Sequence, residues 1–134
     1  MSAHRILQPE GWAAPRGYAN GIEAEGRTVF VAGQIGWNPE TAAFETDDFV
    51  GQVDQALRNV AAVMAEAGAG PEHLVRMTWY VTDRAAYLAD TRALGRVWRD
   101  TFGSEYPAMT LVVVAGLLEE RARVEIEATA VVPM

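Results

Sequence analysis

Three stretches of this sequence are apolar at nearly every consecutive position, and this feature most restricts how the chain folds. They read VFVAG at residues 29–33, MTWYV at 77–81 and LVVVAG at 111–116. A strand with one face in water alternates apolar and polar side chains, whereas these strands place apolar side chains on both faces. We therefore expect a sheet that is buried on both faces.

Two helices accompany these strands in the pattern. One is expected from about Asp48 to Ala67, where apolar residues recur at helical spacing and Gly68 follows as a C-terminal cap. The second is capped by Asp83 and ends at Gly103. Strands are expected within residues 16–26, 27–37, 73–83, 108–116 and 122–132, the first two joined by a turn at Glu25-Gly26. The order ββαβαββ predicts an α+β domain with both helices on one face of the sheet.

Two helices cover only one face of such a sheet, so the second apolar face requires another partner. The simplest partner is another copy of the chain, and we expect an obligate homo-oligomer with the open sheet face inside. The sequence shows no long linker, internal repeat or low-complexity segment, so residues 1–134 are read as a single domain.

The composition excludes several classes of function. The chain has no cysteine, which rules out disulfides, thiol nucleophiles and thiolate metal sites. Its formal net charge is −7, it has no lysine, and its 11 arginines are scattered, so nucleic-acid binding is not expected. No apolar run resembles a signal peptide or reaches transmembrane length, so we expect a cytoplasmic protein that does not enter a membrane.

Few residues offer obvious catalytic or metal-binding chemistry. His4 and His73 have no second ligand at metal-binding spacing, and the only serines, Ser2 and Ser104, are not in a nucleophile motif. The short glycine-containing stretches lack the spacing of a dinucleotide or phosphate loop. We therefore expect neither a metal nor a cofactor. Gly33, within a strand, is read either as part of a turn or as a point where a ligand approaches the backbone closely.

The stretch VEIEATA at residues 124–130 has two interpretations. Val124, Ile126 and Ala128 share one face of a strand, and Glu125 and Glu127 share the other. The two glutamates are either a solvated acidic face on an edge strand or include a carboxylate that moves a proton or positions water in a cleft. The aromatic residues are read as core or subunit-interface residues rather than a binding cage, among them Tyr18, Trp37, Trp79, Tyr80 and Trp98.

Five stretches in this order resemble the RidA family, also called the YjgF or L-PSP family: YANGI, VFVAGQIGWNPET, VRMTWYVTD, EYPAMT and RVEIEATAVV. The resemblance covers about residues 15–132. It implies a chorismate-mutase-like α+β fold and a homotrimer whose sheets form a central β-barrel, with small-molecule clefts between subunits. In active members these clefts hydrolyse reactive enamines and imines, such as 2-aminoacrylate, to the 2-keto acid and ammonia.

The resemblance also implies roles for individual residues. Tyr18, Gly33 and Glu125 match the tyrosine, the backbone glycine and the water-positioning glutamate of the family's cleft. Glu125 and Tyr18 are thus the candidate catalytic residues.

The same alignment departs from the family pattern at three positions. Met109 occupies the slot of the arginine that grips the substrate carboxylate, Ala32 replaces a serine, and Arg92 aligns with a helical asparagine. Met109, Leu111 and Ala32 are expected to line a more apolar pocket, and Arg92 is a candidate replacement for the missing charge. Three readings stay open: an imine hydrolase of altered specificity, a non-catalytic trimer that binds a small metabolite, or a methionine that only packs an unused cleft.

Overall fold

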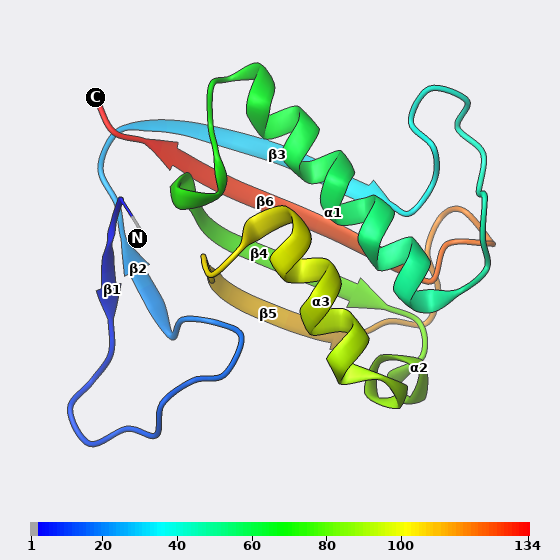
Figure 1. The fold of residues 1–134 in the computed structure, drawn as a ribbon, viewed down its shortest axis with the longest axis horizontal. Helices are drawn as coiled ribbons and strands as arrows, with labels where there is room; N and C mark the ends of the chain where they lie inside the picture. The colour runs from blue at the N-terminus through cyan, green and yellow to red at the C-terminus, as the bar shows by residue number, and fades with distance from the viewer. Residues whose placement is uncertain (1–2) are drawn as a thin grey trace.

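The computed structural model describes residues 3–134 and contains a larger and a smaller sheet, with helices packed on the larger one (Figure 1). This confirms the predicted α+β class. Its elements are β1 (Arg5–Leu7), β2 (Gly21–Glu23), β3 (Arg27–Ile35), α1 (Phe49–Glu66), a 3-10 turn (Pro71–His73), β4 (Leu74–Val81), α2 (Arg84–Ala89), α3 (Thr91–Phe102), β5 (Ala108–Val113) and β6 (Val124–Val132). None of the helices in this part of the chain is long and apolar enough to cross a membrane.

The larger sheet has four strands in the order β3-β6-β4-β5. β6 runs antiparallel to both of its neighbours, whereas β4 and β5 are parallel. The segment VEIEATA therefore lies on an interior strand, and its interpretation as an edge strand is wrong. The edges of the sheet are β3 and β5, two strands that are far apart in the fold.

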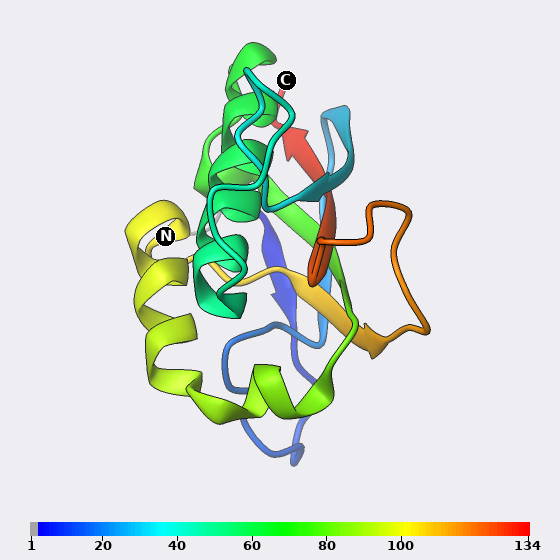
Figure 2. The same ribbon diagram turned by 90° about the vertical axis from the view of Figure 1, so that its right-hand side faces the viewer.

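The first predicted helix is confirmed as α1. The Asp48 carboxylate accepts a 2.9 Å hydrogen bond from the Gly51 amide, which caps the first turn. The apolar positions at helical spacing face the sheet and are buried, namely Phe49, Val53, Leu57, Val60 and Met64. α1 and α3 pack on the same face of the sheet, as Figure 2 shows from the side.

The second predicted helix is wrong in one respect, because it is broken into α2 and α3. Asp83 caps α2 as predicted, by accepting hydrogen bonds from the amides of Ala85 and Ala86. Asp90 then leaves helical geometry, with φ −150° and ψ 75°, and its carboxylate caps α3 through the Ala93 amide at 3.0 Å. A second internal cap thus lets the chain turn before α3 continues along the sheet.

The N-terminal strands also differ from the prediction. The strand expected within residues 16–26 is limited to Gly21–Glu23, and it pairs with the unpredicted β1 instead of with β3. The turn at Glu25-Gly26 therefore joins two sheets. Gly26 has φ +147° and lies so close to Val132 that a Cβ would collide with its carbonyl oxygen, so this connection requires glycine.

The face of the sheet opposite α1 and α3 is exposed in the single chain. Phe30 on β3 is 79% exposed, and Val112 on β5 is exposed as well. Thr78 and Tyr80 on β4 also lie on this face, so it is amphipathic rather than uniformly apolar. A subunit packed on this face would bury Phe30.

Candidate functional site

Glu125 and Gly33 lie together in a hollow of about 360 Å³ at the β3 edge of the sheet. The hollow is lined further by Gln34, Ile35, Trp37, Leu118 and Glu119. β3 carries a bulge here, because Val31 pairs with Ala128 while Gln34 already pairs with Ile126. The two intervening residues of β3 are therefore outside the regular ladder.

Gly33 leaves room for the side chain of Glu125. A Cβ at Gly33 would collide with the carboxylate of Glu125 and would lie 2.9 Å from its Cγ and Cδ. The bulge and the missing side chain together let this carboxylate lie against exposed backbone. An acidic group beside irregular backbone at a sheet edge is suited to positioning a water molecule or moving a proton.

Met109 lines a different hollow, of about 280 Å³, between α3 and β5. Met109 pairs with Met77 in the β4–β5 ladder and packs against the core, so it lies on the helix side of the sheet. The hollow is mainly aromatic and apolar, and its other lining residues are Gly17, Trp79, Tyr87, Thr91, Leu94, Gly95, Trp98, Arg99 and Tyr106. A thioether at this point extends an apolar wall.

Tyr18 lies near the hollow that contains Met109. The amide of Ala19 donates a 2.8 Å hydrogen bond to the carbonyl of Pro107, and this fixes the Gly17–Ala19 segment beside the start of β5. Gly17 lines the hollow, and Tyr18 is 41% exposed next to it. The predicted tyrosine is therefore near Met109 and is held on the opposite edge of the sheet from Gly33.

The predicted site residues thus occupy two separate surfaces of one chain. Met109 is on β5 and Gly33 is on β3, with β6 and β4 between them. Three strand spacings amount to about 14 Å, and Met109 and Glu125 also face opposite sides of the sheet. A single site that contains both residues therefore requires two copies of the chain.

Ala32 and Leu111 lie in neither of these hollows. Ala32 faces the open side of the sheet and lines a shallow depression of about 440 Å³ together with Phe30, Thr78 and Glu127. Leu111 pairs with Trp79 and packs against the core. Within one chain the expected pocket of Met109, Leu111 and Ala32 does not form.

Glu127 is engaged by a tyrosine from the neighbouring strand. The Tyr80 hydroxyl donates a 2.7 Å hydrogen bond to its Oε1. This hydrogen bond raises the pKa of Tyr80, and partial desolvation and the negative charges of Glu127 and Glu125 act in the same direction, against Arg76, which lowers it. Glu127 thus has a structural partner, whereas Glu125 faces a hollow.

Arg92, the candidate replacement for the missing arginine, is exposed on α3 and is not among the residues that line these hollows. Its neighbour Thr91 and, two turns later, Arg99 line the hollow of Met109 instead. Tyr87, Gly95 and Tyr106 also line this hollow and were not predicted from the sequence. Helical spacing from Thr91 through Gly95 to Arg99 is the signal that could have found this surface.

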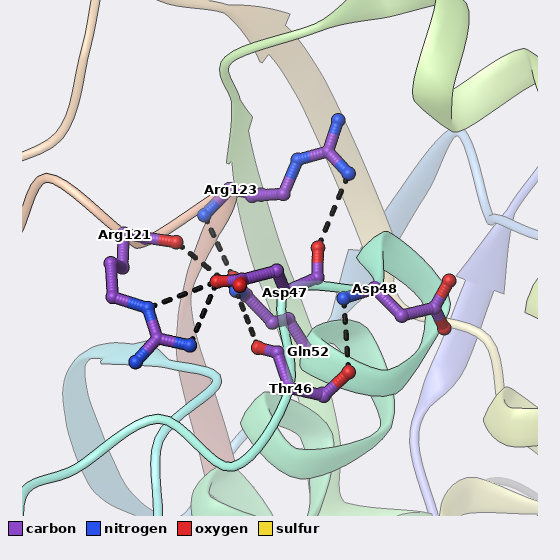
Figure 3. A network of polar contacts seen from close by, with 6 residues as sticks. All are labelled: Thr46, Asp47, Asp48, Gln52, Arg121 and Arg123. Atoms are coloured by element: carbon purple, nitrogen blue, oxygen red, sulfur yellow. Dashed lines mark hydrogen bonds and ion pairs between the residues drawn. The ribbon is translucent and has the colours of Figure 1, made fainter.

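A buried amide holds the loop beside Glu125 in place. The side chain of Gln52 donates to the carbonyls of Thr46 and Arg121, both at 3.1 Å, and accepts a 2.8 Å hydrogen bond from the Arg123 amide (Figure 3). At the surface Arg121 forms a 2.8 Å ion pair with Asp47. These contacts tie the β5–β6 loop to the start of α1, and the same loop carries Leu118 and Glu119 to the Glu125 hollow.

Within residues 3–134, no group of three or more His, Asp or Glu side chains is arranged to hold a metal ion. The Nδ1 atom of His73 accepts a 2.9 Å hydrogen bond from the Gly70 amide, which gives this histidine a structural role in the 3-10 turn.

The chain matches a known protein family over most of its length. A family model described as "Endoribonuclease L-PSP" matches residues 10–132. The chain belongs to this family. It is the family also called RidA or YjgF, as the sequence resemblance predicted.

Individual relatives agree with this assignment over most of the chain. A "RutC family protein" of Aquifex aeolicus is 38% identical over 116 residues, which span 85% of this chain and 87% of the relative. A "2-iminobutanoate/2-iminopropanoate deaminase" of Dermatophagoides farinae is 32% identical over 133 residues, 98% of this chain and 99% of the relative. The crystal structure of YyfB, a Rid family protein of Yersinia pestis, superposes with a TM-score of 0.84 at 30% identity and covers 96% of this chain and 98% of its own.

Proposed function

We propose that this RidA family protein binds a reactive imine or enamine in a cleft between two subunits and hydrolyses it to a carbonyl compound and ammonia. Relatives named as 2-iminobutanoate/2-iminopropanoate deaminases support this reaction class. The observation that carries the proposal is the carboxylate of Glu125 against the backbone of Gly33 at the bulge of β3.

The chemistry assigned to the cleft is general acid–base catalysis. Water adds to the carbon of the protonated C=N bond while Glu125 takes up a proton from that water. Glu125 then returns this proton to the nitrogen of the resulting carbinolamine, and the C–N bond breaks as the C=O bond forms. The departing ammonia takes the proton of the carbinol hydroxyl, so a neutral carbonyl compound and ammonium leave. Tyr18, brought by the neighbouring subunit, is suited to hydrogen-bond the substrate or this water.

The separation of the two hollows supports a site shared between subunits. Glu125 and Gly33 lie at the β3 edge, and Met109 and Tyr18 lie beside the β5 edge. We propose a closed ring of three chains in which the β3 edge of one copy meets the β5 edge of the next, so that the two half-sites would lie at one subunit boundary. The exposed Phe30 face would then line the inside of that ring. We therefore propose a homotrimer with a central β-barrel.

Met109 is proposed to change the specificity of this cleft. An arginine binds a carboxylate through two parallel hydrogen bonds, and a methionine cannot do so. Removing one member of such a charge pair costs about 2–5 kcal/mol of binding. A small 2-imino acid held at this position alone would therefore bind poorly, and larger, more apolar imines would gain from the aromatic wall.

A coupled assay of ammonia release tests the proposal. The substrates are 2-iminopropanoate and the imine of phenylpyruvate, each generated in place by an amino-acid oxidase and compared with buffer alone. We expect wild type to accelerate the release of ammonia from the larger imine and Glu125→Gln to lose this acceleration. Glu120→Gln removes an exposed carboxylate from the neighbouring loop and serves as the matched control. Full activity in Glu125→Gln would refute the assigned role of Glu125.

A non-catalytic binding trimer is the second candidate, and the replacement of the carboxylate-binding arginine by Met109 is the observation that favours it. In that case neither imine would turn over above the buffer rate, and ligand affinity would be equal in wild type and Glu125→Gln. Cleavage of RNA is not proposed despite the wording of the family description, because a lysine-free chain of net charge −7 repels a polyphosphate backbone.

A further inference from the structure

We propose that Arg99 supplies the carboxylate-binding group that Met109 cannot, so that the hollow between α3 and β5 takes a carboxylate carrying a flat apolar or aromatic group. This inference deepens the proposed function and rests on it for the reaction, but the binding step is tested separately. According to this inference, the residue that selects the substrate carboxylate is Arg99 on α3, and Met109 at the start of β5 does not bind it.

The charge around the hollow favours an anion. Arg99 lines it and is exposed, and its guanidinium makes no hydrogen bond or ion pair with the residues that the structure describes. No aspartate or glutamate is among the lining residues. A guanidinium offers a planar fork of donors that matches a carboxylate, and an apolar surrounding strengthens that interaction.

The geometry of α3 directs Arg99 over the hollow. Thr91, Gly95 and Arg99 follow one another at intervals of four residues and therefore lie on one stripe of the helix. A Cβ added at Gly95 would lie 3.2 Å from Nη1 of Arg99, so the guanidinium extends back along the helix across Gly95. This places the charge over the stretch of α3 that lines the hollow.

The glycine at position 95 is consistent with a ligand site in the hollow between α3 and β5. A glycine inside a helix costs about 1 kcal/mol relative to alanine, and Gly95 is the fifth residue of α3, a helix capped by Asp90. Its φ is not in the left-handed region, so the backbone does not require it. What the glycine provides is room beside Arg99, and that room is part of the hollow.

The walls suit a flat apolar group. Trp98 stacks on Tyr106 with an interplanar angle of 10° and a centroid distance of 5.8 Å, and Trp79 and Tyr87 meet edge to face. Met109 lies beside these rings and completes a soft apolar surface. Trp79 is 4% exposed and contributes its ring to the same apolar wall.

Direct binding of phenylacetate and of its uncharged analogue phenylacetamide, measured by titration calorimetry on the whole protein, tests the inference. We expect wild type to prefer phenylacetate, and Arg99→Met to bind it about 10- to 100-fold more weakly while its affinity for phenylacetamide stays the same. Arg96→Met removes another exposed arginine of α3 and is the matched control, with unchanged affinity for both probes.

Gly95→Ala is a second, independent test of the role of Arg99. Alanine raises helix propensity, so the free energy of unfolding is expected to hold or rise, while the added methyl displaces Arg99 and weakens phenylacetate binding. A variant that folds at least as well and binds worse cannot be explained by damage to the fold.

Three results would overturn the inference: no binding of phenylacetate to wild type, equal affinity in wild type and Arg99→Met, or loss of phenylacetate binding in Arg92→Met with Arg99→Met unaffected. These results differ from those expected if only the proposed imine hydrolysis is wrong. In that case ammonia release would be absent, while the Arg99-dependent preference for phenylacetate would persist.

Discussion

The hydroxyl of Tyr80 on β4 donates a 2.7 Å hydrogen bond to Oε1 of Glu127 on β6, on the side of the sheet opposite α1 and α3. Tyr80 donates only when it is protonated, so the acceptor carboxylate raises the pKa of this phenol. The pair therefore links the two central strands in a way that depends on pH.

The sign of that dependence follows from the direction of the pKa shift. Because the pKa of Tyr80 is higher in the folded than in the unfolded protein, its contribution to stability is present below about pH 10 and is lost as the pH rises through the folded pKa. We expect Glu127→Gln to lower the pKa of Tyr80. The ultraviolet absorbance of tyrosinate measures this, with Tyr80→Phe as the subtraction control. An unchanged titration curve would contradict the hydrogen bond.

Gly33→Ala is expected to act through Glu125. The new methyl would collide with the carboxylate, and the flexible end of Glu125 must turn away. Stability should change by less than about 1 kcal/mol, because alanine also restricts the unfolded chain. Catalysis of imine hydrolysis should fall as far as it does in Glu125→Gln, and the double variant should lose no more. Gly116→Ala, where a methyl meets open space, is the control, and additive losses would argue against a shared mechanism.

Gln52 and Arg121 contribute very differently to stability, although both belong to the network of Figure 3. Gln52→Leu leaves two carbonyls and the Arg123 amide without their side-chain partner, and we expect a loss of about 2–5 kcal/mol. Arg121→Ala breaks an exposed ion pair and should cost less than about 1 kcal/mol. Urea denaturation measures both variants, and equal losses would mean that the amide is not the main anchor of the loop.

Phe30 is expected to hold the oligomer together. In solution we expect a mass about three times the 14.6 kDa of the chain, because one copy leaves this ring 79% exposed. Phe30→Glu should dissociate the assembly or shift its equilibrium toward single chains, as measured by sedimentation. Leu88→Glu, on α2 and at a position that is 52% exposed, is the comparison for an apolar surface residue away from the open sheet face and from both hollows. A wild-type protein that sediments as a single chain would refute both the trimer and the shared site.

Local signals in the sequence were sufficient for some elements and insufficient for others. α1 was predictable because its apolar spacing and its Asp48 cap act within a few residues. The break at Asp90 was missed, since the apolar spacing continues across it and only the cap to Ala93 separates α2 from α3. β1 is three residues long and depends on pairing with β2, so no local pattern announces it.

The site was less predictable than the fold because it depends on long-range register. Alternation along a strand is enough to predict that Glu125 and Ile126 lie on opposite faces of the sheet. The strand order β3-β6-β4-β5, which no local pattern predicts, is what places Met109 and Gly33 on opposite edges. Arg99 appeared in sequence only as one of several arginines on a helix. Its closeness to Met109 arises from the packing of α3 on β5 and from the missing side chain of Gly95.

Met109→Arg brings these elements into one experiment. An arginine at the start of β5 would supply a carboxylate-binding fork in the same hollow as Arg99, but from the sheet side. If Glu125 of one subunit and Tyr18 of the next form an intact catalytic site, the variant should gain hydrolysis of 2-iminopropanoate by about tenfold or more, because the small substrate no longer depends on the aromatic wall. Its rate on the imine of phenylpyruvate should fall, since the new charge occupies the space beside Trp98.

The ratio of the two kcat/KM values in the coupled ammonia assay measures this shift, with Met109→Leu as the uncharged control. If wild type already hydrolyses 2-iminopropanoate as fast as Met109→Arg does, then Met109 does not set the specificity, and Arg99→Met in the wild-type background identifies whether α3 already holds the carboxylate.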